Sequence, residues 1–313
     1  MWIYFARRLI LSILVIVIAV TLLNVMLHLV PGDPAVMILG PRATPELIEA
    51  FRIKMGLDQP FHVQMATFFW HLLQGDLGTD VFTNRSVADI VFDQLPFTLT
   101  LISVSILWAS AIGIPLGCFS AIRRNSLLDK VAGVLSVSVI SIPAFVMALY
   151  ALLIFAVALK WLPAIGAGEA GLGNRLEHLI LPAFTVGVSW VGYIARVVRA
   201  SMLEVLGETH VKMARAFGLT ERRIVFGYAL PIAILPTVTL LGVGVAYLVS
   251  ASVFAEVIFA RPGVGALIVN AVDSRNYPIV LGCVLVTTVL FVLATLVSDL
   301  VNALLDPRAR EQL

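Results

Sequence analysis

Six long apolar runs constrain this chain more than any other feature of its sequence. A helix needs roughly 20 mostly apolar residues to cross the hydrocarbon core of a membrane. The fourth run is the weakest, because Pro182, Gly187, Ser189 and Gly192 interrupt it. The pattern predicts an all-α integral membrane protein with six spans, and five or seven spans are the alternatives. The runs cover residues 9–30, 98–122, 131–159, 179–198, 231–259 and 278–304.

Composition excludes several other classes of protein. The chain has 313 residues, of which 60% are hydrophobic and 13% charged, whereas a soluble domain is about 45–50% apolar and about 25% charged. The net charge of +2 is too small for a nucleic-acid-binding protein. Cys118 and Cys283 both lie inside apolar runs, which argues against a disulfide framework and a zinc site. The first run is too long for a signal-peptide core and is interpreted as an uncleaved anchor.

The segment between the first two runs, residues 31–96, has a different composition. It carries 8 of the 19 acidic residues and several Pro-Gly and Gly-Asp turn signals. Thr44-Pro45-Glu46 predicts the start of an amphipathic helix that ends at Gly56. Further helices are expected over residues 63–73 and 87–95. We therefore expect a small helical segment outside the membrane, too small to be an enzyme domain.

The basic residues predict the orientation of the chain. With six spans and a cytoplasmic N-terminus, 13 of the 21 Lys and Arg residues lie on the cytoplasmic side, as the positive-inside rule requires. Both termini are then cytoplasmic. The expected organisation is a cytoplasmic start and first span over 1–30, an extracytoplasmic segment over 31–96, a membrane core over 97–304 and a cytoplasmic tail over 305–313.

The cytoplasmic connection between the fourth and fifth spans is the most informative stretch. It is long for a helix–helix connection, which suggests a structure of its own. Glu208 and Thr209 can begin a short helix that runs through Ala216, and Gly218 can end it. A second helix start at Thr220 leads into the fifth span. The sequence predicts a helical hook, basic on one side and small on the other.

This stretch resembles the EAA loop of ABC-importer permeases, and most closely that of the dipeptide/oligopeptide/nickel branch. The family pattern is E-A-A, three residues, G, nine residues and I-x-L-P. Gly218 is followed at that spacing by Leu230-Pro231, with Tyr228 in the Ile position. The triplet falls on residues 212–214, of which only the last is alanine, but Ala-Arg-Ala-x-Gly over 214–218 matches the core of the peptide branch.

Other motifs extend the resemblance over nearly the whole chain. Two positions depart from the family pattern: Arg261 stands where a Trp usually precedes Pro-Gly, and Asn276 where an Asp usually precedes Tyr-Pro. Both are expected on the outer side, where they could affect receptor docking or substrate entry. The matching motifs are Pro31-Gly32-Asp33-Pro34, Gly56-Leu57-Asp58-Gln59-Pro60, Gly75-Asp76-Leu77-Gly78, Ser201-Met202-Leu203-Glu204-Val205, Pro262-Gly263-Val264-Gly265, Tyr277-Pro278 and Asp306-Pro307-Arg308.

The resemblance implies a type I ABC-importer permease with a coupling loop at 200–230. The loop would dock into a cleft of a partner ATPase, with small residues allowing close approach and Lys212 and Arg215 offering charge pairs. Partners implied are a second homologous permease, one or two ABC ATPase subunits, an extracytoplasmic solute-binding protein and membrane lipid, with no nucleic acid. The residues assigned to the coupling loop are Gly207, Glu208, His210, Lys212, Ala214, Arg215, Ala216 and Gly218.

The fifth span would contribute to the translocation path. Gly242, Tyr247, Ser250 and Glu256 are the candidate path residues, although small residues in this span suit close helix packing equally well. Glu256 could be a gate or a helix-end charge. Pro115 and Pro143 are expected to kink the second and third spans.

No catalytic or metal site is predicted. The chain contains no G-x-x-x-x-G-K-[ST] motif, so ATP and Mg²⁺ would bind the partner ATPase subunits and this chain would hold no cofactor. Its five histidines are scattered, with no two at metal-ligand spacing. The scarcity of acidic residues inside the spans argues against a proton- or sodium-coupled carrier.

The predicted function is that of a non-catalytic permease subunit in a bacterial inner membrane. It would form half of the path of an ATP-driven, binding-protein-dependent importer for di- or oligopeptides. Nickel chelates, glutathione and opine-like solutes are alternative cargoes, and a secondary transporter is a more distant alternative.

Overall fold

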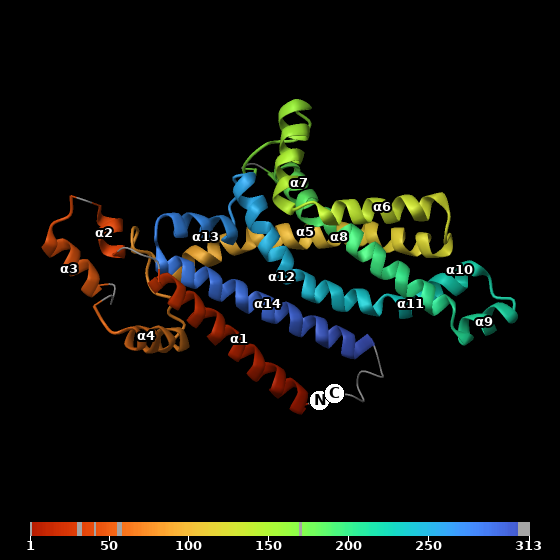
Figure 1. The fold of residues 1–313 in the computed structure, drawn as a ribbon, viewed down its shortest axis with the longest axis horizontal. Helices are drawn as coiled ribbons and strands as arrows, with labels where there is room; N and C mark the ends of the chain where they lie inside the picture. Colours follow the sequence, from red (N-terminus) through yellow and green to blue (C-terminus); the bar gives the residue numbers. More distant parts are fainter. Residues whose placement is uncertain (1, 30–32, 41, 55–57, 169–170, 306–313) are drawn as a thin grey trace. The chain divides into compact units, whose positions relative to one another are not determined.

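A computed structural model describes residues 2–29, 33–40, 42–54, 58–168 and 171–305. The described residues form helices, with one isolated β-bridge between Thr79 and Ser86 (Figure 1). The predictions that rest on Gly32, Gly56 or the tail after residue 305 lie outside the described residues. The chain divides into two compact units, which are described separately: the first contains residues 2–96 and 263–290, the second residues 97–262 and those from 291 onward.

Five helical stretches of the described residues are long and apolar enough to cross a membrane, or six if one bent pair is a single span. Four of the five lie within α1 (Trp2–Leu29), α5 (Val87–Ile122), α8 (Gly171–Leu206) and α14 (Tyr277–Leu305). Helices α5 and α14 contribute residues to both units. The predicted all-helical membrane fold is confirmed.

The fifth stretch begins before the fifth apolar run. It starts at α10 (Glu221–Arg223), passes through the π-helix η2 (Ile224–Ala229) and α11 (Leu230–Ala233), and reaches α12 (Leu235–Ile258). The predicted hook and the fifth span are therefore joined by nearly continuous helix.

The third predicted span is the bent pair. It consists of α6 (Leu127–Ser141), then α7 (Ala144–Ala151) with the π-helix η1 (Leu152–Ala158), and the two halves meet at 99°. Ile142 is extended, with φ −88° and ψ 124°, because the ring of Pro143 disfavours helical geometry in the residue before it. Pro115, by contrast, lies inside α5, which continues as helix through it. Only the break at Pro143 is therefore observed.

The first unit contains the helical segment expected between the first two spans. Two of its helices, α3 (Pro45–Lys54) and α4 (Phe61–Leu73), confirm the predicted ones. The residues of the third predicted helix, 87–95, are helical, but they do not form a separate helix, because they are the start of α5. No glycine separates them from the apolar run that follows. The sequence analysis did not predict α2 (Pro34–Leu39) or α13 (Val264–Asp273).

A buried carboxylate fastens the loop after α4 to the junction of α13 and α14. Asp80 is buried and accepts hydrogen bonds from the backbone N–H of Thr83 at 2.9 Å, from the Thr83 hydroxyl and from the amide of Asn276. Burial raises the pKa of Asp80, but hydrogen bonds from Thr83, Asn276 and the Phe82 backbone outweigh it and hold the pKa below its usual value. Asn276, which departs from the family pattern, is thus an internal hydrogen-bond donor.

Helix α8 is the centre of the second unit, where it packs against α6, α7 and α12. Small residues let the helices approach closely. A Cβ placed on Gly117 of α5 would lie 2.4 Å from the Ala195 carbonyl oxygen, and one on Gly192 of α8 would lie 2.9 Å from the Ser136 carbonyl oxygen. Close backbone approach of this kind is how membrane helices gain packing energy without a hydrophobic driving force.

An ion pair joins the start of α6 to the last turns of α8. Arg199 donates two hydrogen bonds to Asp129, at 2.6 and 2.8 Å, and the backbone N–H of Asn125 donates a third at 2.9 Å. Asp129 is buried whereas Arg199 is partly exposed. Bidentate pairs of this kind fix geometry as well as charge, so the turn between α5 and α6 lies at the same end of α8 as the hook.

The glycine at 117 provides a test of this packing. Gly117→Ala should lower the melting temperature of the detergent-solubilised protein, because a methyl group against a backbone carbonyl forces α5 and α8 apart at a cost of about 1–3 kcal/mol. Gly133→Ala on α6 is the matched control, since its Cβ would meet nothing within 4 Å. The control should leave the melting temperature unchanged or raise it, because alanine is the better helix former. Equal effects would contradict the packing assigned to Gly117.

The Asp80–Asn276 contact predicts a pH-dependent defect. Asn276→Asp places two carboxyl groups side by side in a buried site, where both cannot be ionised, so the pKa of one rises. A carboxyl group whose pKa is raised by folding destabilises the protein above its unfolded pKa and less so below it. The melting temperature of the variant should fall at pH 7, and the deficit should shrink toward pH 4. Asn270→Asp, on the exposed side of α13, should show no such pH dependence.

Candidate functional site

The hook, residues 207–218, contains α9 (Thr209–Ala216) and follows the end of α8 (Figure 1). Its predicted helix is confirmed residue for residue. The backbone N–H of Leu219 bonds the carbonyl of Ala214, and that of Gly218 bonds the carbonyl of Arg215. This pair of bonds is the Schellman motif, and Gly218 has the left-handed φ of +78° that it requires.

The helix start differs from the prediction in one detail. Glu208 is the N-cap residue, but its side chain makes no capping hydrogen bond. Its carboxylate lies instead 2.9 Å from Nδ1 of His210. Thr220 likewise precedes α10 without a side-chain cap. The backbone conformation, and not the side-chain oxygens, sets where these helices begin.

One face of α9 is packed into the core of the second unit. Val211 and Ala214 are buried, three residues apart on the same side of the helix. They belong to one apolar cluster with Met202 and Val205 of α8 and Ile224 of η2. The sequence interpretation placed Ala214 on the docking surface; the structure places it underneath, where its small size lets α9 lie close to η2 and α8.

Arg215 is engaged within the chain. Its Nε and Nη2 donate to the Glu221 carboxylate at 2.7 and 3.1 Å, and the hydrogen bonds to Glu221 raise the pKa of the guanidinium. Because both groups are exposed, the pair adds little to stability. Its two parallel hydrogen bonds do fix the angle between α9 and α10.

The outward face of the hook carries residues that the sequence analysis did not single out. Met213 and Phe217 are four residues apart, and 54% and 80% of their surfaces are exposed. Residues at this spacing lie on one side of a helix, here the side away from Val211. Lys212 and Ala216 are exposed beside them. Aromatic residues and methionine are enriched in protein interfaces, so this spacing could have identified the surface.

A pocket of about 430 Å³ adjoins the hook. It is lined by Thr220, Arg222, Arg223 and Phe226. Two exposed arginines at its wall make it suited to an acidic side chain. The hook and this pocket together form what we term the coupling face: residues 212, 213, 216 and 217 with the pocket residues.

The four candidate path residues on α12 fall into two groups. Gly242 and Glu256 are buried: a Cβ on Gly242 would lie 2.0 Å from the Ser298 Cβ, and Glu256 accepts a hydrogen bond of 2.6 Å from the Thr98 hydroxyl. Tyr247 and Ser250 are exposed on the helix surface. Gly242 is thus a packing residue, and the structure does not bring the four together.

The exposed residues of α12 form a stripe. From Tyr247 to Val257 their spacing alternates between three and four residues, which is the spacing of a helix seam that faces another helix. The described members are Pro236, Thr239, Tyr247, Ser250, Phe254 and Val257.

Arg261 is also buried, although the sequence analysis expected it near receptor docking or substrate entry. It follows α12 and donates its backbone N–H to the Glu256 carbonyl at 2.8 Å. As to metals, the described residues contain no group of three or more His, Cys, Asp or Glu side chains that could hold an ion.

Two family models match the chain. One is "Binding-protein-dependent transport system inner membrane component", over residues 113–311. The other is the N-terminal model of the same kind of membrane component, over residues 1–102.

Similar proteins extend over the whole length. The glutathione transport system permease protein GsiC of Salmonella choleraesuis (strain SC-B67) is 37% identical over 307 residues, covering 98% of both chains. That of Escherichia coli (strain K12) is 36% identical over 311 residues, again with 98% coverage of both. A solved structure of the MetNI methionine ABC transporter shares the fold, with a TM-score of 0.58 at 20% identity, covering 69% of this chain and 95% of that one. The chain therefore belongs to the family of inner-membrane components of binding-protein-dependent transport systems, as a multi-pass permease of an ABC importer.

Proposed function

We propose that this chain is one of two homologous permeases that together form the path of an ATP-driven importer of short peptides, glutathione among them. The observation that carries the proposal is the coupling face: an exposed Met213–Phe217 pair on a helix whose opposite side is packed into the core. An exposed aromatic residue on a firmly held helix is suited to docking another protein.

The partner that fits this face is an ABC ATPase subunit. Phe217 would enter an apolar cleft of the ATPase, and Arg222 and Arg223 would meet acidic side chains at its rim. ATP and Mg²⁺ would bind that subunit, and this chain would contribute no catalytic group. One or two such ATPases, a second permease and an extracytoplasmic solute-binding protein complete the proposed assembly.

Motion at the hook would reach the membrane through short, packed connections. Val211 and Ala214 hold α9 against η2 and α8, and the Arg215–Glu221 pair holds it against α10. From α10, nearly continuous helix leads into α12. When two ATPases close around ATP, displacement of the hooks would therefore tilt α8 and α12 as rigid elements.

The second permease would meet the exposed stripe of α12. Tyr247, Ser250 and Phe254 lie on this stripe, so in the pair they would face the path or the partner helix. The proposed orientation has both termini and the hook in the cytoplasm, since the basic residues of the hook and of the α5–α6 turn lie at the same end of α8.

The substrate proposal rests on the GsiC relatives, whose names give glutathione as their solute. Glutathione is itself a tripeptide, which places it within the peptide class that the sequence motifs imply. Nickel chelates and opine-like solutes are the remaining candidates.

Phe217→Ala tests the docking surface. Loss of the aromatic side chain should reduce ATP-driven uptake about tenfold or more, as hot-spot truncations do, while the amount of protein in the membrane stays unchanged. Phe92→Ala is the matched control, because Phe92 is an exposed phenylalanine outside the hook. Full uptake by the Phe217 variant, or equal losses in both variants, would contradict the proposal.

The geometry of the hook can be tested separately at Gly218. Gly218→Val puts a β-branched residue at a φ of +78°, which costs about 1–2 kcal/mol or more. We expect the variant to assemble in the membrane but to hydrolyse ATP without importing solute. Gly227→Ala is the control, since a Cβ there meets nothing within 4 Å and its φ is not left-handed. If ATP hydrolysis stays tightly coupled to uptake in the Gly218 variant, the hook does not transmit motion from the ATPase to the membrane helices.

The substrate is tested with the complete importer in proteoliposomes. Glutathione or dipeptides, presented with the cognate binding protein, should stimulate ATP hydrolysis and enter the vesicles. Stimulation by a nickel chelate or an opine alone would refute the peptide assignment and leave the permease assignment intact.

A further inference from the structure

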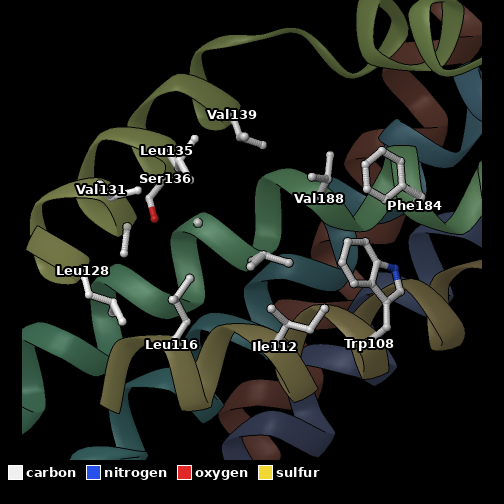
Figure 2. A pocket seen from close by; sticks show the side chains of 13 residues that line it. Trp108, Ile112, Leu116, Leu128, Val131, Leu135, Ser136, Val139, Phe184 and Val188 are labelled. Atoms are coloured by element: carbon white, nitrogen blue, oxygen red, sulfur yellow. The ribbon is translucent and has the colours of Figure 1, made fainter. Parts of the chain in front are cut away.

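A narrow apolar slot lies between α5, α6 and α8, away from the coupling face. Its volume is about 310 Å³. Figure 2 shows Leu128, Val131 and Leu135 of α6 along one side and Leu116, Ile112 and Trp108 of α5 along the other. Ser136 is the one hydroxyl-bearing residue among the lining side chains, so the slot is suited to a hydrocarbon and not to a polar solute.

An aromatic pair lines one end of the slot. The rings of Trp108 and Phe184 stack with their centroids 5.8 Å apart and 16° between their planes. Trp108 is fixed there, because its Nε1 donates a hydrogen bond of 3.0 Å to the Ala183 carbonyl. Figure 2 places this pair at the opposite end from Leu128. A chain that enters beside Leu128 would therefore run toward Trp108.

The Leu128 end of the slot lies beside a positively charged turn. Leu128 is in the first turn of α6, directly after the α5–α6 turn, which carries Arg123 and Arg124. These arginines and Lys130 are exposed, and none has an ion-pair partner among the described residues. The nearby acid, Asp129, is buried and already bound to Arg199. The turn thus presents uncompensated positive charge where the apolar slot begins.

We propose that this slot holds one acyl chain of an anionic phospholipid, whose headgroup phosphate binds Arg123 and Arg124. Basic residues at the mouth of a groove between membrane helices are a recognised arrangement for anionic headgroups, and arginine matches phosphate geometry in two hydrogen bonds. The acyl chain would fill the space between α6 and the α5–α8 pair, and it could leave that space. It would contact α8, the helix that leads into the hook.

The size of the slot favours a lipid over a protein partner. The slot has a volume of about 310 Å³. A helix with its side chains is about 10–12 Å across and cannot enter a space of that volume. A hydrocarbon tail, which is one methylene group wide, can enter it.

The proposal is tested by native mass spectrometry of the complete importer in detergent, with phosphatidylglycerol or phosphatidylcholine of identical acyl chains added. We expect phosphatidylglycerol to be retained in preference to phosphatidylcholine. The double substitution Arg123→Gln, Arg124→Gln should weaken this retention roughly 25-fold, since each basic residue at an anionic surface contributes about a factor of five. Lys160→Gln with Arg175→Gln removes the same charge elsewhere and should change nothing.

Variants that fill the slot provide a second test of the same proposal. Leu135→Trp should abolish retention of the phospholipid, whereas Leu153→Trp, at an exposed leucine of η1, should not. Val131→Phe provides an independent filling variant if Leu135→Trp does not assemble. Equal retention of the two lipids, or unchanged retention in the filled or double-glutamine variants, overturns the proposal. Loss of the second permease from the Leu135→Trp complex, with lipid retained, would also overturn it and mark the groove as a protein interface.

Discussion

The close packing of α8 against its neighbours is the constraint on which the second unit depends. In a membrane, water cannot drive helices together, so contact relies on small residues and a few internal hydrogen bonds. Gly117 and Gly192 bring the backbones of α5, α8 and α6 into contact, and Arg199–Asp129 fixes α6 on α8 by charge. Because α8 continues directly into the hook, the most firmly held helix is also the one that carries the coupling face.

Much of the fold could be predicted from the sequence because the bilayer imposes a simple rule. Apolar runs of about 20 residues gave the spans, and Gly218 gave the end of α9, since a left-handed C-cap requires glycine. The start of α5 could not be predicted in this way: residues 87–95 look like a separate amphipathic helix, but no break separates them from the span. The right-angled bend at Pro143 also exceeds what a proline alone predicts.

The site was predictable in position but not in orientation. Motif spacing located the hook, yet it could not show which side of α9 faces the core. Ala214 and Arg215 looked available for a partner, whereas one is buried and the other is bound to Glu221. Apolar residues are usually buried, so Met213 and Phe217 do not stand out as surface residues unless their spacing is considered. Their spacing of four residues indicates a shared side of the helix, and the burial of Val211 shows that this side is the exposed one.

The central claim is that Phe217 lies in the contact with the ATPase. The most direct measurement places an environment-sensitive fluorophore on Phe217→Cys; Cys118 and Cys283 are buried, so the new thiol is the one within reach of the label. Addition of the ATPase subunits should shift the emission to the blue and protect the site from aqueous quencher, while a label on Phe92→Cys stays unchanged. A label at Phe217→Cys that is equally open to quencher in the complete importer would contradict the account.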